Sequence, residues 1–237
     1  MFDALFTTTT EYKKLSHALS GKGACALFGL PASGRAQVYA ALCRQLDKPL
    51  CIVTPGEAEA TRFAADLNTL GIPAAVFPAR DYVLRPIEGT AREYEYRRLA
   101  VLGELVGGRL RAVAVPAEAL TQFTTPKEDF CANTRTLHAG DTLLRDDLLA
   151  ALFGAGYTRR AQVDGPGQFS VRGDIVDIFA PDQKMPVRME FWGDEIDTLH
   201  TFDLTTQRRE DAIDKFYLSP AREVLFGKPA DAAEQLR

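Results

Sequence analysis

Residues 168–209 read QFSVRGDIVDIFAPDQKMPVRMEFWGDEIDTLHTFDLTTQRR, and this stretch decides how the second half of the chain folds. Its apolar runs are broken by turn-forming residues at 172–174, 180–182 and 193–194, a rhythm typical of consecutive β-strands joined by turns. Within the run VRMEFW at 187–192 the side-chain character alternates with a period of two, as in a strand with one buried face. The stretch therefore predicts a β-rich domain.

The two faces of the strand at 187–192 differ in chemistry. One face is apolar and forms an ordinary core surface, with Val187, Met189 and Phe191. The other face combines Arg188, Glu190 and Trp192, the only tryptophan of the chain. An arginine, a carboxylate and an aromatic ring together have the composition of a protein-binding hot spot. A half-buried tryptophan beside a solvated ion pair has the same composition, and periodicity alone does not separate the two interpretations.

The same stretch resembles the UvrB-like domain with which nucleotide-excision-repair proteins contact UvrA. The resemblance rests on the Arg-Gly-Asp turn at 172–174, the Arg-x-Glu strand at 188–190, the Asp-Glu-Ile-Asp arm at 194–197 and the closing residues 202–209. Two families carry this domain, the damage-recognition helicase UvrB and the bacterial transcription-repair coupling factor Mfd. The resemblance extends more loosely over the whole chain.

The resemblance implies a partner and a binding surface. The partner is UvrA, and the centre of the surface is formed by Arg172, Arg188, Glu190 and Trp192. Tryptophan stands at 192 where the family pattern suggests phenylalanine, a change that keeps a flat apolar anchor and enlarges it. Arg188 and Trp192 are expected to point away from the core, so the fold should tolerate their replacement.

Composition excludes several classes of protein. A length of 237 residues suits one large or two small domains. A net charge of −4 argues against a chain whose main task is to bind nucleic-acid phosphates. The four cysteines show no C-x-x-C spacing and the three histidines are scattered, so we expect no metal site. No signal segment or membrane-spanning run is present, which predicts a cytoplasmic protein.

The first half of the chain alternates short apolar runs with amphipathic ones. Strands are expected at 24–28, 49–53, 74–77 and 112–115. Helices are expected at 34–46, 57–70 and 90–106. Strands rich in alanine and valine that alternate with helices imply a parallel sheet covered on both faces. We therefore predict an α/β domain of the P-loop, RecA- or helicase-like type over residues 1–125.

The rhythm changes after residue 123. An inserted α+β domain, the UvrB-type UvrA-binding domain of the resemblance, is predicted at 126–212, and residues 126–209 should fold on their own. Residues 213–237 resemble a strand, a turn and the start of a helix, and in the resembled families the chain returns here to the first domain. An end within an apparent helix suggests a fragment of a longer protein.

A segment before the first helix has the spacing of a Walker A phosphate loop, G-x-x-x-x-G-K-[ST], with Gly29 and Gly34 in place. The lysine that would reach the β- and γ-phosphates is Arg35, and the hydroxyl that would hold Mg²⁺ is the methyl group of Ala36. Pro31 removes one of the backbone N–H groups of the cradle. We expect no catalysis at this degenerate nucleotide loop, while a weak anion site at the helix N-terminus stays open as an alternative.

Two features favour the coupling factor over UvrB. UvrB has an intact phosphate loop and a long aromatic hairpin that clamps DNA, whereas only residues 78–89 lie between the third expected strand and the next helix here. The N-terminal module of the coupling factor is known for a UvrB-like body, a degenerate loop, no DNA hairpin and a retained UvrA-binding domain. The resemblance thus implies a non-catalytic module, without a cofactor of its own, that recruits UvrA in transcription-coupled nucleotide excision repair.

For the whole protein, the resemblance implies an ATP-driven translocase that displaces stalled RNA polymerase on double-stranded DNA. Its motor, with ATP and Mg²⁺, would lie outside this sequence. The alternative is an ATP-dependent, UvrB-like DNA-binding repair enzyme with an unorthodox phosphate loop. A third interpretation is an inert structural scaffold that does not bind UvrA.

Two further charged clusters carry weaker predictions. Asp194, Glu195 and Asp197 resemble a metal site, but a solvated acidic strand after a tight turn explains them better. Arg208 and Arg209 are expected to close the β-rich domain against an acidic neighbour.

Overall fold

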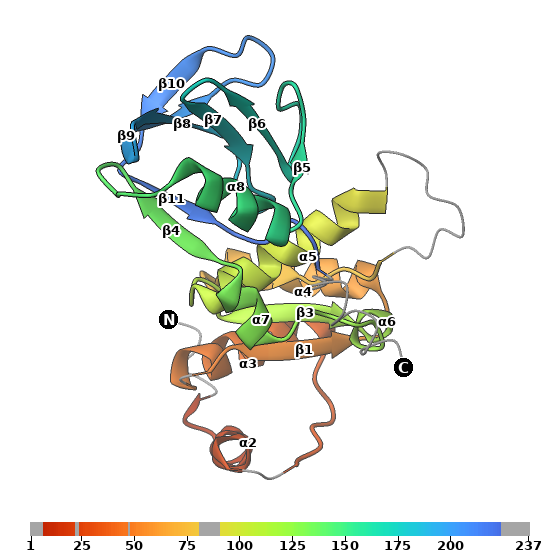
Figure 1. Cartoon of the computed structure of the whole chain (residues 1–237). Coiled ribbons are helices and arrows are strands. Elements are labelled where there is room, and N and C mark those ends of the chain that lie inside the picture. The colour runs from red at the N-terminus through yellow and green to blue at the C-terminus, as the bar shows by residue number, and fades with distance from the viewer. Residues whose placement is uncertain (1–6, 22–23, 47, 81–90, 224–237) are drawn as a thin grey trace. The chain divides into compact units, whose positions relative to one another are not determined.

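The computed structural model describes residues 7–21, 24–46, 48–80 and 91–223 (Figure 1). The chain forms two compact units, one made of residues 1–79 and 107–122 and the other of residues 80–106 and 123–237. In the described part of the chain, no helix combines the length and the apolar character that a membrane span requires. The structure thus groups residues 80–106 with the second half of the chain, whereas the sequence assigned them to the first domain.

A three-stranded parallel sheet lies at the centre of the first unit, in the order β1-β3-β2. Its strands are β1 (Leu50–Thr54), β2 (Ala74–Val76) and β3 (Ala112–Pro116), and its helices are α2 (Thr10–Ser20), α3 (Ala32–Gln45), α4 (Glu57–Thr69) and α6 (Ala117–Leu120). One apolar cluster joins residues of α3 and α4 to β1 and β3. The parallel α/β pattern that the alternating runs predict is therefore present.

The strand expected at 24–28 does not form. These residues pair with no strand among the residues that the structure describes and are exposed, with Leu27 at 46% and Phe28 at 87% of their accessible surface. Apolar composition gives a segment the capacity to pack on a pleated surface, but it does not supply the neighbouring strand. The prediction was wrong because it inferred a long-range partner from a local pattern.

The second unit is built on a six-stranded sheet in the order β10-β9-β8-β7-β6-β5. Its strands are β5 (Thr158–Arg159), β6 (Gln168–Arg172), β7 (Ile175–Phe179), β8 (Val187–Trp192), β9 (Glu195–Phe202) and β10 (Arg209–Ala212). Neighbours are antiparallel except for the short parallel pair β5 and β6. The β-rich domain that the turn rhythm predicts is confirmed.

One face of this sheet carries the main core. Figure 1 shows helix α8 (Arg145–Gly154) lying over the sheet, and Leu148 and Leu152 of α8 belong to the same buried cluster as the inward residues of the strands. Those residues include Val187, Met189 and Phe191, at 3%, 0% and 6% exposed. The apolar face assigned to the strand at 187–192 is thus the core face.

A small second sheet completes that core. Strand β4 (Arg135–His138), which follows helix α7 (Lys127–Ala132), pairs antiparallel with β11 (Lys215–Leu218). Phe216 and Leu218 of β11 are buried in the cluster beneath the six-stranded sheet. Residues 215–218 therefore pack within the β-rich unit, although the sequence placed the start of the return segment at 213.

A buried ion pair fixes helix α5 (Ala91–Val106) to the residues that follow β11. The guanidinium of Arg98 contacts the carboxylate of Glu223 at 2.8 Å, and both side chains are fully buried. The backbone N–H of Glu223 donates to the side chain of Glu95, also at 2.8 Å. This contact explains why α5 belongs to the second unit.

Candidate protein-docking site

Two hairpin turns lie at one end of the six-stranded sheet. Each has the sequence Gly-Asp, at 173–174 between β6 and β7 and at 193–194 between β8 and β9, and the two glycines adopt φ of +60° and +64°. Glycine reaches this region at low cost because it has no Cβ. Since β6 and β8 run in the same direction on either side of β7, their last residues, Arg172 and Trp192, emerge at the same end.

Strand register arranges the outward-facing residues behind these turns in two rows. The row nearest the turns contains Arg172, Ile175, Glu190 and Thr198. The next row contains Ser170, Asp177, Arg188 and His200. Directly paired residues share one face of a sheet, so the two rows lie opposite the main core. We call these two rows, together with Arg209, the charged face.

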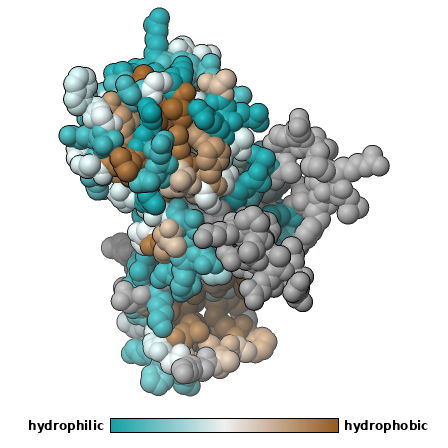
Figure 2. Space-filling view, viewed as in Figure 1, coloured by the Kyte–Doolittle hydropathy of each residue, from teal (hydrophilic) through white to brown (hydrophobic). Residues whose placement is uncertain are grey.

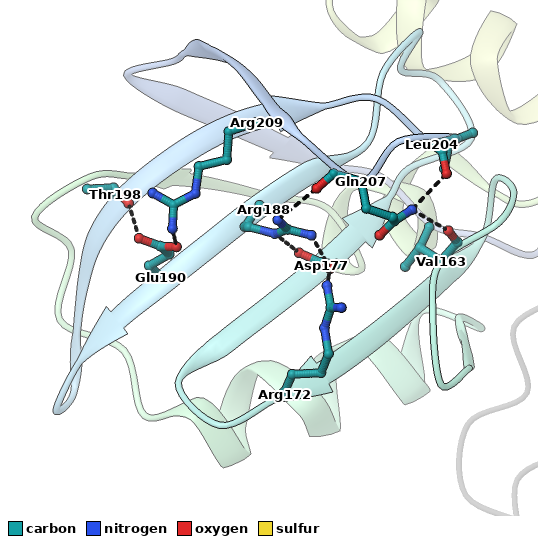
Figure 3. Close-up of polar contacts among 9 residues, drawn as sticks. All are labelled: Val163, Arg172, Asp177, Arg188, Glu190, Thr198, Leu204, Gln207 and Arg209. Atoms are coloured by element: carbon teal, nitrogen blue, oxygen red, sulfur yellow. Dashed lines mark hydrogen bonds and ion pairs between the residues drawn. The ribbon is translucent and has the colours of Figure 1, made fainter.

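Arg188 is held deep in the charged face by Asp177 (Figure 3). Its Nε donates to Oδ1 at 2.7 Å and its Nη2 to Oδ2 at 3.0 Å, and the two side chains are only 10% and 1% exposed. The guanidinium also lies 4.7 Å from the ring centroid of Phe202 and donates to the carbonyl of Gln207. The hydrogen bonds to Asp177 raise the pKa of Arg188 above its ordinary value. Arg188 thus points away from the main core, as expected, but it is buried on the outer face of the sheet.

A small apolar cluster explains this burial. Phe179 and Phe202 project on the same side of the sheet as Arg188 and pack with Val163, outside the main core. Phe202 is fully buried and Val163 likewise. The outer face is therefore covered at one end by the chain's own loops, which alternation along a single strand does not reveal.

Arg172 shares the same carboxylate but lies at the surface. Its Nη2 donates to Oδ2 of Asp177 at 2.6 Å, and its side chain is 47% exposed. Two guanidinium groups thus surround one carboxylate, and the group of three carries a surplus positive charge. That surplus is presented to solvent at Arg172.

Glu190 pairs with Arg209 and accepts a hydrogen bond from the hydroxyl of Thr198 at 3.2 Å (Figure 3). A glutamate two residues from Arg188 on the same strand face has the position to orient that arginine or to meet a basic group of the partner. In the structure Asp177 orients Arg188, and Glu190 is held by one of the two arginines expected to close the domain against an acidic neighbour.

Trp192 is 82% exposed and closes the β8–β9 hairpin opposite Glu195. The interpretation as a half-buried tryptophan is therefore wrong. In Figure 2 most of the visible surface of the β-rich unit is hydrophilic, with hydrophobic patches between. A large aromatic side chain that its own chain leaves uncovered is typical of an interaction site.

Residues 136–224, which include both hairpins and the charged face, match the family model of the UvrB interaction domain. These residues belong to the UvrB interaction domain family. The match ends close to Glu223, the last residue that the structure describes.

The UvrB interaction domain lies within a longer region of similarity to repair proteins. The chain is 35% identical over 209 residues to the transcription-repair-coupling factor of Myxococcus xanthus and 28% identical over 212 residues to that of Bacillus subtilis, covering 84% and 89% of the chain. It is also 28% identical over 226 residues to UvrABC system protein B of Chlorobium limicola. The chain spans 17%, 18% and 32% of the length of these three relatives, in that order.

The sequence pattern marked residues 202–209 as the close of the β-rich domain, but it did not show how the loop within them is held. Gln207 is the only non-glycine residue with positive φ, +60°, in the part of the chain that the structure describes. Its carbonyl accepts from Arg188, and its side-chain amide donates to the carbonyl of Leu204 at 2.8 Å. Asp203 fixes the same loop by accepting from the backbone N–H and the hydroxyl of Thr206. The loop therefore positions both Arg188 and the start of β10.

Outside the UvrB interaction domain, the loop of Walker A spacing leads into α3. Arg35 turns toward α4, where its Nη1 lies 3.8 Å from the carboxylate of Glu59. Ala36 is only 3% exposed and packs in the apolar cluster beneath the parallel sheet, Gly34 lies inside the helix, and Gly29 adopts a φ of +81°. The methyl of Ala36 is a packing group, and Arg35 is engaged with a carboxylate.

A hollow of about 210 Å³ lies beside this loop, between α2 and α3. Its described lining is mainly apolar, with Tyr12, Leu15, Leu30 and Val38, and its charged member is Glu11.

The short region 78–89, on which the absence of a DNA hairpin depends, falls mostly outside the described residues. Within the described ranges no group of histidine, cysteine, aspartate or glutamate side chains is arranged to hold a metal ion.

Proposed function

We propose that this chain is a docking module that binds UvrA through the turn end of the six-stranded sheet, and so recruits it in transcription-coupled nucleotide excision repair. The observation that carries the proposal is Trp192, which is 82% exposed at the end of β8 inside a UvrB interaction domain. Exposed Arg172 lies at the same end of the sheet. The similarity to transcription-repair-coupling factors supports the pathway.

The four residues assigned to the surface have different physical roles in this proposal. Trp192 supplies apolar area that becomes buried on association, and Arg172 supplies forked N–H donors for a carboxylate of the partner. Arg188 is too buried to offer the same contact, so it acts from beneath by holding Asp177. Glu190, 20% exposed and paired with Arg209, contributes a polar rim.

We further propose that the start of α3 has no nucleotide chemistry and that this chain is not itself an enzyme. The burial of Ala36 and the contact between Arg35 and Glu59 support this, because Mg²⁺ and the γ-phosphate would each lack a ligand. ATP, Mg²⁺, RNA polymerase and double-stranded DNA are assigned to the longer protein of which the relatives are examples. The alternative, an ATP-dependent UvrB-like enzyme, requires a saturable Mg·ATP site in this chain, and titration calorimetry would detect it.

A titration of the chain with purified UvrA, with and without ATP, tests the docking function. Trp192→Ala should weaken binding about thirtyfold, corresponding to a hot-spot loss of about 2 kcal/mol. Phe123→Ala is the matched control, since Phe123 is an aromatic residue that is 61% exposed in the same unit. Equal affinity of the parent and Trp192→Ala would remove the site from the proposal, and no binding by the parent would remove the function.

A further inference from the structure

We infer that Asp177 is a positioning residue of the docking surface, which acts on the partner through Arg172. The inference rests on the proposed UvrA-docking function and adds to it a residue that does not itself reach the surface. Asp177 lies in the middle of the second row of the charged face and is 1% exposed. A partner protein therefore cannot contact it directly, and any effect on binding has to pass through a neighbour.

Both oxygens of the Asp177 carboxylate are engaged (Figure 3). Oδ1 accepts from Arg188 alone, whereas Oδ2 accepts from Arg188 at 3.0 Å and from Arg172 at 2.6 Å. Arg188 is in turn fixed by the ring of Phe202 and the carbonyl of Gln207. Because the carboxylate is held on its buried side by a fixed guanidinium, its second oxygen is a rigid anchor for Arg172.

Arg172 needs such an anchor. It is the last residue of β6 before a hairpin turn, its long side chain is 47% exposed, and Asp177 is the hydrogen-bond partner that the described residues give it. A flexible arginine loses side-chain freedom when it binds a partner, and a guanidinium that is already oriented loses less. One N–H of the fork is used by Asp177, so the others are available to a carboxylate of the partner.

The charge balance favours an acidic group on the partner at this position. Arg172, Arg188 and Asp177 together carry one surplus positive charge, and Arg172 is the exposed member of the three. The neighbouring pair of Glu190 and Arg209 is balanced and offers no net charge. Replacement of Asp177 by asparagine would leave two guanidinium groups facing a neutral amide, and Arg172 would turn away from Arg188.

A double-mutant cycle separates positioning from a merely structural role. The melting temperature is measured for the parent, Asp177→Asn, Arg172→Ala and the double variant. The UvrA dissociation constant of each is then measured at a temperature below its melting temperature. We expect Asp177→Asn to weaken binding about three- to tenfold in the parent, the range set by ordering one long side chain. In the Arg172→Ala background it should change binding less than about twofold, while the melting temperature falls in both backgrounds.

Asp214→Asn is the control for the loss of one carboxylate, because Asp214 is exposed between β10 and β11. Parental affinity of Asp177→Asn, or an equal loss in both backgrounds, would overturn the inference. If Asp177→Asn does not fold, Asp177→Glu keeps the charge and displaces the carboxylate, and the same cycle applies.

A readout without UvrA keeps this inference distinct from the proposed function. Nitrogen relaxation at the Arg172 guanidinium should report an ordered group in the parent and a mobile one in either Asp177 variant. An Arg172 side chain that is mobile in the parent would overturn the positioning role. A parent that shows the ordered guanidinium but does not bind UvrA would overturn the docking function instead.

Discussion

The outer face of the six-stranded sheet and the start of α3 each place an arginine opposite a carboxylate, and the two pairs differ in geometry and burial. Arg188 and Asp177 meet through two hydrogen bonds of 2.7 and 3.0 Å, with side chains 10% and 1% exposed. Arg35 and Glu59 approach to 3.8 Å, with side chains 48% and 29% exposed. A buried two-point pair fixes structure, whereas an exposed single contact contributes little. The spacing of a motif shows where an arginine lies in the sequence. The burial of its carboxylate partner determines whether the arginine fixes the structure.

The largest expected effect concerns the core beneath the charged face. A fragment of residues 126–223 should keep the folded sheet, whereas residues 126–209 should not, although the sequence suggested that they would. The shorter fragment lacks Phe216 and Leu218, and the loss of two buried side chains of this size costs more than about 5 kcal/mol. Circular dichroism and the dispersion of amide resonances would measure it. Two equally folded fragments would show that β11 is dispensable.

The comparison of the two arginines is tested directly by their removal. Arg188→Ala should lower the free energy of unfolding by about 3–5 kcal/mol, because it leaves the Asp177 carboxylate buried without its main partner. Arg35→Ala should change it by less than about 0.5 kcal/mol. Urea denaturation of both variants gives the two values. A similar cost for both would contradict the comparison, and Arg188→Ala combined with Asp177→Ala should recover part of the loss.

Substitutions that restore the phosphate-loop pattern at the start of α3 should destabilise the fold and should not produce nucleotide binding. Ala36→Thr places a larger, polar side chain where the parent has a methyl group that is 3% exposed, and this should cost about 1–3 kcal/mol. Ser33→Thr is the control, since Ser33 is exposed in the same helix. Combined with Arg35→Lys, Ala36→Thr should still give no saturable binding of Mg·ATP by titration calorimetry. A micromolar site would show that the loop had kept its capacity to bind nucleotide.

The smallest expected effect is a pH dependence in the loop that covers one end of the charged face. Hydrogen bonds from Thr206 lower the pKa of Asp203 below its ordinary value of 3.8. A carboxylate with a lowered pKa contributes stability that is fully present above about pH 3.8. This stability is lost as the pH falls through the pKa of the folded state. Urea denaturation of the parent and Asp203→Asn should therefore give a difference that is constant above about pH 5 and shrinks in acid. A difference independent of pH would assign the effect of Asp203 to packing.

Much of the charged face could be predicted from sequence, because tight turns fix register. The Gly-Asp turn pairs Arg172 with Ile175 and therefore places Asp177 diagonally across from Arg172. The contact between Asp177 and Arg188 could not be derived in the same way, since the connection from β7 to β8 is longer and does not fix the register. Its burial depends further on Phe202, which lies on another strand.

The errors share one physical cause, which is that long-range pairing is not encoded in local pattern. Residues 24–28 have the composition of a strand but pair with no other strand in the described part of the chain. Strand β11 was assigned to a returning segment, but it pairs with β4, which lies far back in the sequence. Residues 215–218 form the strand that their pattern predicts and residues 24–28 do not, because a strand forms only where a neighbouring strand is available.

The two outermost strands of the six-stranded sheet also determine how one molecule meets another. Strand β10 is exposed at all four positions and carries Arg209, Glu210 and Asp211, while β5 at the opposite edge has only two residues. Exposed charged side chains along β10 disfavour its pairing with a strand of another copy, and β5 is too short to serve as a template. The sheet thus resists edge-to-edge aggregation and can leave a large aromatic side chain exposed without its own strands joining those of another copy.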